Sequence, residues 1–181
     1  MDPIFAGQEL SDLELIETFR RDADGSFPYL PLHLDRLKAS AAKLGWHYDR
    51  RTVHEALDAL PAATGARRVR LTMDAAARIR VQDADLAPNP ARWRLALADL
   101  SLNSADPWLS IKSTRRAVYD QARAALPPGI DELLFLNERQ ELCEGTITNL
   151  FIRRDGQLLT PRLGSGLLPG ILRRRLLESG E

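Results

Sequence analysis

Two residues in the second half of the chain, Lys112 and Glu144, have side chains that could carry out chemistry. Lys112 follows an apolar run and precedes residues 113–126, whose spacing predicts a helix, so we expect the lysine at the mouth of that helix. The helix dipole disfavours a cation there, and apolar surroundings lower the pKa of a lysine, which favours covalent reaction with a carbonyl compound. The alternative is a surface lysine that caps a loop.

Glu144 follows Leu142 and Cys143 and precedes Gly145, so we expect its side chain to point into a buried site. A carboxylate there could hold a proton on a ring nitrogen of a bound cofactor. The alternative is a strand-end acid that bonds to local backbone amides. Cys143 fits a small core residue better than a nucleophile, because no histidine lies near it in the sequence.

Two further features could bind a phosphate group. Glycines precede a helix that begins near Pro169, and the exposed amides of Gly170, Ile171 and Leu172 would face an anion at its N-terminus. Arg36 lies beside the apolar stripe of an earlier helix, where its forked guanidinium could reach inward. Glycines that punctuate a helix, and an arginine paired with Asp35 or with solvent, are the alternatives.

Alternating strands and amphipathic helices must position these side chains, which indicates an α+β protein. We expect a domain at residues 1–85, a linker at 86–92 with two prolines, and a larger domain at 93–181. The expected helices cover residues 31–44, 51–60, 113–126 and 169–178. The expected strands cover residues 13–20, 27–30, 67–73, 77–81, 93–98, 132–136, 146–152 and 157–160.

Composition excludes several classes of function. The 25 basic and 25 acidic residues cancel, so no global charge favours nucleic acid or an acidic membrane surface. A single cysteine excludes an internal disulfide bond, and we expect no metal site and no transmembrane segment. These features predict a cytoplasmic protein. Only three basic residues are lysines, Lys38, Lys43 and Lys112, and arginine cannot replace a lysine that forms a Schiff base.

Taken in order, the motifs resemble those of the class IV aminotransferases, which are pyridoxal-phosphate enzymes of fold type IV. The resemblance rests on residues 32–37 (Leu-His-Leu-Asp-Arg-Leu), residues 111–116 (Ile-Lys-Ser-Thr-Arg-Arg) and residues 144–151 (Glu-Gly-Thr-Ile-Thr-Asn-Leu-Phe), followed by Thr160-Pro161 and Leu167 to Ile171. It implies a two-lobed fold like that of D-amino-acid aminotransferase, and usually a homodimer that acts on a small amino substrate.

The resemblance also implies a role for each matching residue. Lys112 would be the Schiff-base lysine, Arg36 would bind the cofactor phosphate, and Glu144 would contact the pyridine nitrogen. Asn149 would support the site, while the backbone of Ile171 and Leu172, next to Gly170, would bind phosphate. Thr18 and Arg116 would lie on the substrate side.

Within the family, Arg116 four residues after the lysine is more typical of aminodeoxychorismate lyases, which form pyruvate and p-aminobenzoate for folate synthesis. Branched-chain aminotransferases usually carry a tyrosine five residues after the lysine, where Ala117 stands. A branched-chain or D-amino-acid transaminase is the alternative. The sequence ends soon after the phosphate-binding helix, so we also expect a C-terminal lobe without its last strands. A non-catalytic relative, acting as an accessory or interaction protein, is the alternative from another class.

Overall fold

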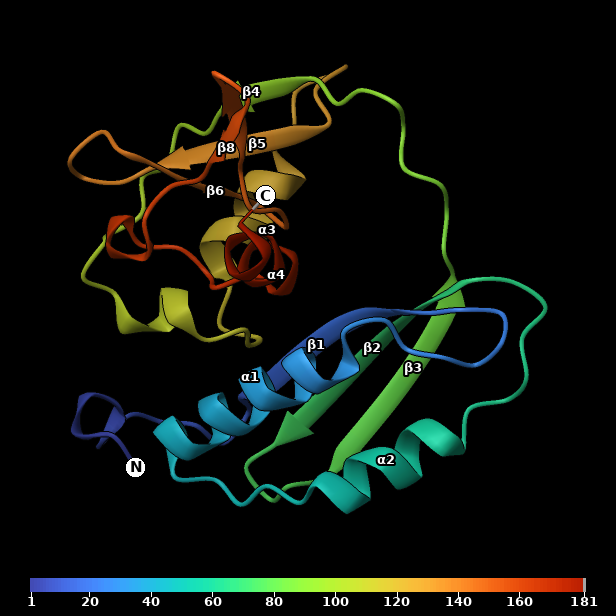
Figure 1. Cartoon of the computed structure of the whole chain (residues 1–181). Coiled ribbons are helices and arrows are strands. Elements are labelled where there is room, and N and C mark those ends of the chain that lie inside the picture. The colour runs from blue at the N-terminus through green and yellow to red at the C-terminus, as the bar shows by residue number, and fades with distance from the viewer. Residues whose placement is uncertain (181) are drawn as a thin grey trace. The chain divides into compact units, whose positions relative to one another are not determined.

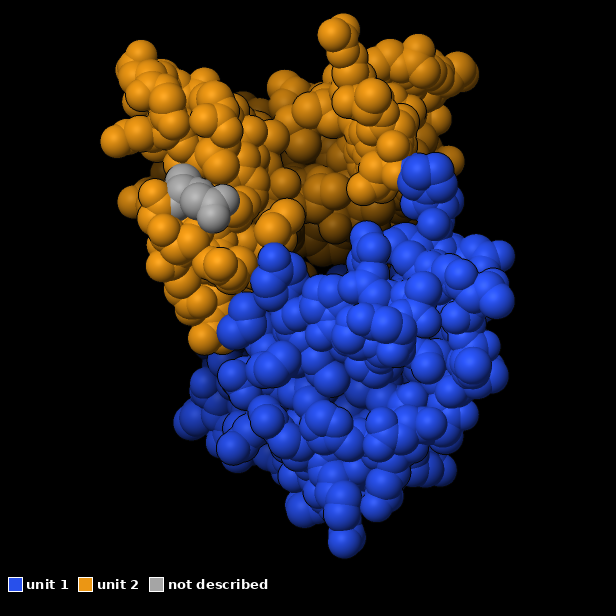
Figure 2. Space-filling view, turned by 45° about the vertical axis from the view of Figure 1, so that its right-hand side comes forward, with its two compact units in different colours: residues 1–88, 112–114 blue, residues 89–111, 115–181 orange. Residues whose placement is uncertain are grey.

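The computed structural model describes residues 1–180, which divide into two compact units (Figure 2). Unit 1 comprises Met1–Pro88 together with Lys112–Thr114, and the described part of unit 2 comprises Asn89–Ile111 and residues 115–180. The break after Pro88 falls in the stretch predicted as a linker, while the assignment of two independent domains stays a prediction.

Unit 1 is an antiparallel three-stranded sheet with two helices on one side (Figure 1). The strands lie in the order β1-β2-β3, and a short 3-10 helix, η1 (Pro3–Phe5), precedes them. Their bounds are β1 Glu14–Arg21, β2 Arg67–Asp74 and β3 Ile79–Asp85, and the helices are α1 Leu30–Leu44 and α2 Arg50–Asp58. Both helices were predicted from sequence to within two residues at each end.

Periodicity explains how these elements bury a core. In β1, Leu15, Glu17 and Phe19 lie on the face that the helices cover, and all three are buried. In α1, the apolar residues at helical spacing are also buried: Leu34, Leu37, Ala41 and Leu44. The helix ends at Gly45, whose φ of 72° lies in the left-handed region that glycine adopts without strain.

The expected strand at residues 27–30 is absent from unit 1. Instead, Asp24 accepts hydrogen bonds from both the amide and the hydroxyl of Ser26, and Leu30 N donates to Phe27 O in a turn. Tyr29 then adopts a left-handed conformation at the N-cap of α1. This local turn chemistry satisfies backbone groups that a strand would have paired across a sheet.

Unit 2 contains a second three-stranded sheet, in which β4 (Leu95–Leu97) runs parallel to β5 (Glu132–Leu136) and β6 (Leu142–Gly145) antiparallel to it. Helix α3 (Ala117–Ala124) packs against this sheet. The shared core consists of Leu102, Leu109, Ala122, Leu133, Phe135 and Cys143. Beyond it come the hairpin of β7 (Ile152–Arg154) and β8 (Gln157–Leu159) and the helix α4 (Ile171–Ser179), with 3-10 turns η2 (Pro107–Ser110) and η3 (Leu163–Ser165) in the loops.

The prediction of a continuous strand over residues 146–152 was wrong, and the buried Glu132 explains why. Its carboxylate accepts hydrogen bonds from the amides of Thr146 and Ile147 and from the hydroxyls of Thr146 and Thr148. A sheet ladder would need those amides, so β6 ends at Gly145 and regular pairing resumes only at Ile152.

The helix expected at residues 113–126 is also shorter than predicted, and its start is wrong. Ser113 pairs with Leu15 of β1, and Thr114 N donates to Glu14 O, so this segment is extended. Helix α3 begins only at Ala117. Lys112 therefore does not lie at the mouth of a helix, and the argument from the helix dipole does not apply to it.

Across residues 1–180, no helix combines the length and apolar character needed to span a bilayer. Within the same residues, the structure brings no three His, Cys, Asp or Glu side chains together in an arrangement that could hold a metal ion.

Candidate active site

Glu144 is a buried acid on β6 of unit 2, and only 6% of its surface is exposed. Oε1 accepts a hydrogen bond of 2.7 Å from the hydroxyl of Tyr119. Oε2 accepts bonds from the amide of Leu168, at 3.1 Å, and from Nδ2 of Asn149, at 3.3 Å. These three neutral donors reach both oxygens, so they fix the position and the rotation of the carboxylate.

Asn149 connects this acid with the loop that enters α4. Besides its bond to Glu144, Nδ2 donates to Leu168 O at 3.0 Å. The Oδ1 atom lies so close to Gly170 that a Cβ on this glycine would overlap it. Gly170 is therefore required for the close approach of Asn149, which the sequence could not reveal. The structure thus brings the predicted residues Glu144, Asn149 and Gly170 together within unit 2.

The N-terminus of α4 begins directly after this contact. Gly170 occupies the N-cap position and supplies no side-chain cap, and its carbonyl accepts the first bond of the helix, from Arg174 N. The amides of Ile171, Leu172 and Arg173 belong to the first turn, which has no carbonyl partner within a helix. The first two of these are the amides predicted to bind phosphate.

In unit 1, Lys112 is anchored to β1 through its backbone, because Ile16 N donates to Lys112 O at 2.8 Å. Residues opposite each other in an antiparallel pair point to the same face, so Lys112 and Ile16 share a face of β1. Thr18, two residues further along, lies on that same face. The structure therefore brings the predicted residues Lys112 and Thr18 to one side of β1.

Arg36 lies on the opposite face of β1, against a residue that the sequence analysis overlooked. Its Nε and Nη2 atoms donate to Oε1 and Oε2 of Glu17 at 2.8 and 2.7 Å, and Nδ1 of His33 lies 2.7 Å from Oε2. Burial alone would raise the pKa of Glu17, but the bonds and charges of Arg36 and His33 outweigh it and hold that pKa below the ordinary value. Asp35, the partner expected for Arg36, pairs with Arg50 instead.

Arg116 precedes α3 in unit 2. Its guanidinium bonds to Asp120 at 2.7 Å and to Thr146 O at 3.1 Å, and it lies over the ring of Tyr119. Its substrate-side role stays a prediction. Cys143 was expected in the core, and this is confirmed: the residue is fully buried, and burial raises the pKa of its thiol to about 11.

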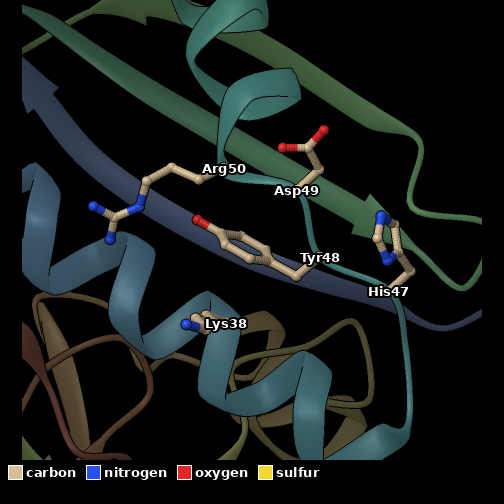
Figure 3. A pocket seen from close by; sticks show the side chains of 5 residues that line it. All are labelled: Lys38, His47, Tyr48, Asp49 and Arg50. Carbon is tan, nitrogen blue, oxygen red and sulfur yellow. The ribbon is translucent and has the colours of Figure 1, made fainter.

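A hollow of about 430 Å³ on unit 1 is lined by Lys38 of α1 and by residues 47–50, where the loop enters α2 (Figure 3). All predicted site residues lie in the described part of the chain, and none of them lines this hollow. A second hollow, of about 190 Å³, lies on the face of the sheet that carries Thr18 and is lined by Glu14, Arg70, Thr72, Arg80 and Gln82.

Comparison with known proteins identifies the family of this chain. A family model described as amino-transferase class IV matches residues 14–181. The chain belongs to the class IV aminotransferases. This family consists of enzymes that use pyridoxal phosphate. A Schizosaccharomyces pombe relative, provisionally named an aminodeoxychorismate lyase, is 33% identical over 163 residues, which cover 87% of this chain and 71% of the relative.

Solved structures of class IV aminotransferases show the same fold, fold type IV, as the sequence predicted. A Mesorhizobium loti protein, provisionally named an amino-acid aminotransferase, is 44% identical with a TM-score of 0.89, over 93% of this chain and 84% of that protein. The 4-amino-4-deoxychorismate lyase of Pseudomonas aeruginosa is 26% identical with a TM-score of 0.75, over 92% of this chain and 68% of the lyase. This chain is shorter than both.

Sequence reasoning missed Glu17 and Tyr119. Glu17 contacts the predicted site residue Arg36, and Tyr119 contacts the predicted site residue Glu144. A signal for Glu17 was available, because an acid between Leu15 and Phe19 interrupts the apolar face of β1. No such signal existed for Tyr119, whose partner Glu144 lies 25 residues further along the chain.

Proposed function

We propose that this class IV aminotransferase is an aminodeoxychorismate lyase, which releases pyruvate from 4-amino-4-deoxychorismate and leaves p-aminobenzoate. The observation that supports its chemistry best is the buried Glu144 carboxylate, held at both oxygens by neutral donors. A homodimer in the cytoplasm, serving folate synthesis, is part of the same proposal.

The residues present fit pyridoxal phosphate. The ring nitrogen of this cofactor carries a proton when it accepts electrons, and a hydrogen-bonded carboxylate such as that of Glu144 can hold that proton. The first turn of α4 offers backbone amides and a positive dipole end to the phosphate. We assign Arg36 as a further phosphate ligand, and Asn149 as the residue that aligns Glu144 with the loop before α4.

Lys112 has two tasks in this proposal. Its amine would hold the cofactor covalently, and it would also take up the proton from the carbon next to the substrate nitrogen. The bound cofactor would supply a sink for the electrons released at that carbon. Glu144 holds the proton on the ring nitrogen throughout. Thr18, which shares a face of β1 with Lys112, and Arg116 are assigned to the substrate side.

The lyase is favoured over a branched-chain transaminase by Ala117, the first residue of α3, because it carries no hydroxyl at the position where those enzymes usually have tyrosine. The lyase names of the S. pombe and P. aeruginosa relatives support the same choice. A transaminase is the second candidate, because the M. loti protein, at 44% identity, carries an aminotransferase name.

Product analysis distinguishes the two candidates. Protein loaded with pyridoxal phosphate is incubated with aminodeoxychorismate, and in parallel with a panel of L- and D-amino acids, with Lys112→Ala as the blank. Pyruvate and p-aminobenzoate in equal amounts support the lyase. Conversion of an amino acid to its keto acid, with no p-aminobenzoate, selects the transaminase. Protein that is colourless after incubation with excess cofactor and removal of the unbound cofactor contradicts both and supports the non-catalytic alternative.

A further inference from the structure

Tyr119 of α3 contacts Glu144, although the family resemblance assigns it no role. Its hydroxyl lies 2.7 Å from Glu144 Oε1, the shortest of the three hydrogen bonds described for this carboxylate. The ring is held edge-on against Phe135 of β5, with centroids 5.2 Å apart and an interplanar angle of 73°. Because Phe135 is fully buried in the core of unit 2, the position of the Tyr119 ring is set by the fold.

The proton of this hydrogen bond belongs to the tyrosine. Burial raises the pKa of Tyr119 far above its ordinary value, and the neighbouring charge of Glu144 raises it further. The hydroxyl therefore stays protonated at any pH at which the protein would work, and it donates to the carboxylate. A donor to the charged form of an acid stabilises that form.

We infer that Tyr119 is a positioning residue, whose hydroxyl holds the Glu144 carboxylate in one orientation and keeps it ionised for the cofactor ring nitrogen. The part of this inference that concerns the cofactor rests on the proposed function. The part that concerns the carboxylate does not, because it follows from contacts within unit 2.

The two carboxylate oxygens are held differently, which gives the tyrosine a distinct effect. Oε2 accepts from Leu168 N and Asn149 Nδ2, both in segments next to α4, whereas Oε1 accepts from Tyr119 on α3. Without the hydroxyl, the carboxylate loses one of the donors that stabilise its charged form, is oriented less firmly and becomes more basic. A more basic carboxylate competes with the ring nitrogen for the proton that they share.

Charged and titratable neighbours could also act on this pair. Arg116 lies 5.6 Å from the centroid of the Tyr119 ring, and Cys143 precedes Glu144 on β6. One turn further along α3, Arg123 bonds to Thr146 and lies 3.7 Å from Glu132, the other buried acid of this sheet. None of these side chains changes in Tyr119→Phe, so a difference between that variant and the wild type reports on the hydroxyl.

The first experiment follows the Glu144 carboxyl by carbon-13 NMR in the full chain before cofactor is added, with Glu144→Gln to assign the signal. In Tyr119→Phe, which keeps the ring against Phe135, we expect the titration midpoint of Glu144 to move to higher pH. Tyr48→Phe removes a buried hydroxyl from unit 1 and should leave the midpoint unchanged. An unchanged midpoint in Tyr119→Phe, with an unchanged melting temperature, overturns the inference.

The second experiment measures the dissociation constant of pyridoxal phosphate by fluorescence titration. We expect Tyr119→Phe to bind the cofactor about tenfold more weakly than the wild type and Tyr48→Phe, because a less firmly oriented carboxylate makes a weaker hydrogen bond to the ring nitrogen. Equal affinities contradict the role of Tyr119 toward the cofactor. A wild-type protein that does not bind the cofactor contradicts the proposed function instead, and the titration of Glu144 still decides what Tyr119 does to the acid.

Discussion

Glu17 of unit 1 and Glu144 of unit 2 are both buried glutamates on strands, yet their surroundings differ. Glu17 receives two bonds from the Arg36 guanidinium and a contact from His33. Glu144 receives bonds from a hydroxyl, an amide side chain and a backbone amide, all of which are neutral. The comparison teaches that the donors around a buried acid, rather than its burial, indicate its role. The Arg36 guanidinium inside unit 1 balances the charge of Glu17, whereas three neutral donors within unit 2 fix the orientation of the Glu144 carboxylate.

The largest expected effect concerns Glu144. Glu144→Gln keeps the size of the side chain but removes the negative charge that, in our proposal, holds the proton on the ring nitrogen of the cofactor. We expect turnover to fall at least about 100-fold, as for the loss of a preorganised electrostatic group. Steady-state assays of the loaded enzyme measure this, with the exposed Glu178→Gln of α4 as the control. Turnover within about threefold of the wild type would be incompatible with the role assigned to Glu144.

The main expected effect of Glu17→Gln is on stability. The change removes the carboxylate charge to which Arg36 Nε and Nη2 bond, and breaking a buried ion pair typically costs about 3 kcal/mol of the free energy of unfolding. Urea denaturation provides the measurement. Glu55→Gln breaks the exposed pair of Glu55 and Arg51 in the same unit and should cost less than about 0.5 kcal/mol. If both variants lost the same small amount, Glu17 would not differ from a surface acid.

Gly170→Ala tests the contact between Gly170 and Asn149, the residue that bonds to Glu144. The added Cβ overlaps Asn149 Oδ1, so the asparagine must move and lose its bonds to Glu144 and Leu168. We expect cofactor affinity to fall about tenfold, since each such bond is worth about 1 kcal/mol. Gly164→Ala is the matched control, because a Cβ there meets no atom within 4 Å. Equal affinities in the two variants would contradict the proposed link between Asn149 and the cofactor.

The smallest expected effect is on pH dependence. Because the pKa of Glu17 in the folded protein lies below the ordinary value of 4.5, this acid stabilises the fold fully above that pH. Its contribution is lost as the pH falls through the lowered pKa. The unfolding free energies of the wild type and Glu17→Gln should therefore differ most at neutral pH and converge in acid. Urea titrations at pH 7 and about pH 3 test this. If the difference in unfolding free energy between the two proteins were larger in acid, the pKa of Glu17 would not be lowered by folding.

The spacing of apolar residues was sufficient to predict the helices of unit 1 and the strands β5 and β8. It failed where side chains capture backbone groups. Glu132 binds the amides of residues 146 and 147, which lie 14 and 15 positions away, and so ends a strand that alternation would continue. Ser113 similarly pairs with β1, about 100 residues earlier, rather than starting a helix.

The residues of the candidate site were predicted one by one from the order of the motifs along the chain. The contacts that orient these residues were not predicted. Asn149 was expected to support the site. In the structure, its side chain donates hydrogen bonds to Glu144 and to the carbonyl of Leu168. Tyr119 could not be predicted, because nothing in α3 alone indicates which strand residue its hydroxyl meets. The functional roles of Lys112, Arg36 and Glu144 stay predictions that the variants above can test.

The central claim is that Lys112 binds pyridoxal phosphate. The chain has three lysines, Lys38, Lys43 and Lys112, so borohydride reduction of the loaded protein followed by peptide mass mapping gives a direct answer. The account predicts one cofactor per chain, on the peptide that contains Lys112, and no labelling of that kind in Lys112→Ala. Cofactor found on Lys38 or Lys43, or stoichiometric labelling of Lys112→Ala, would contradict it.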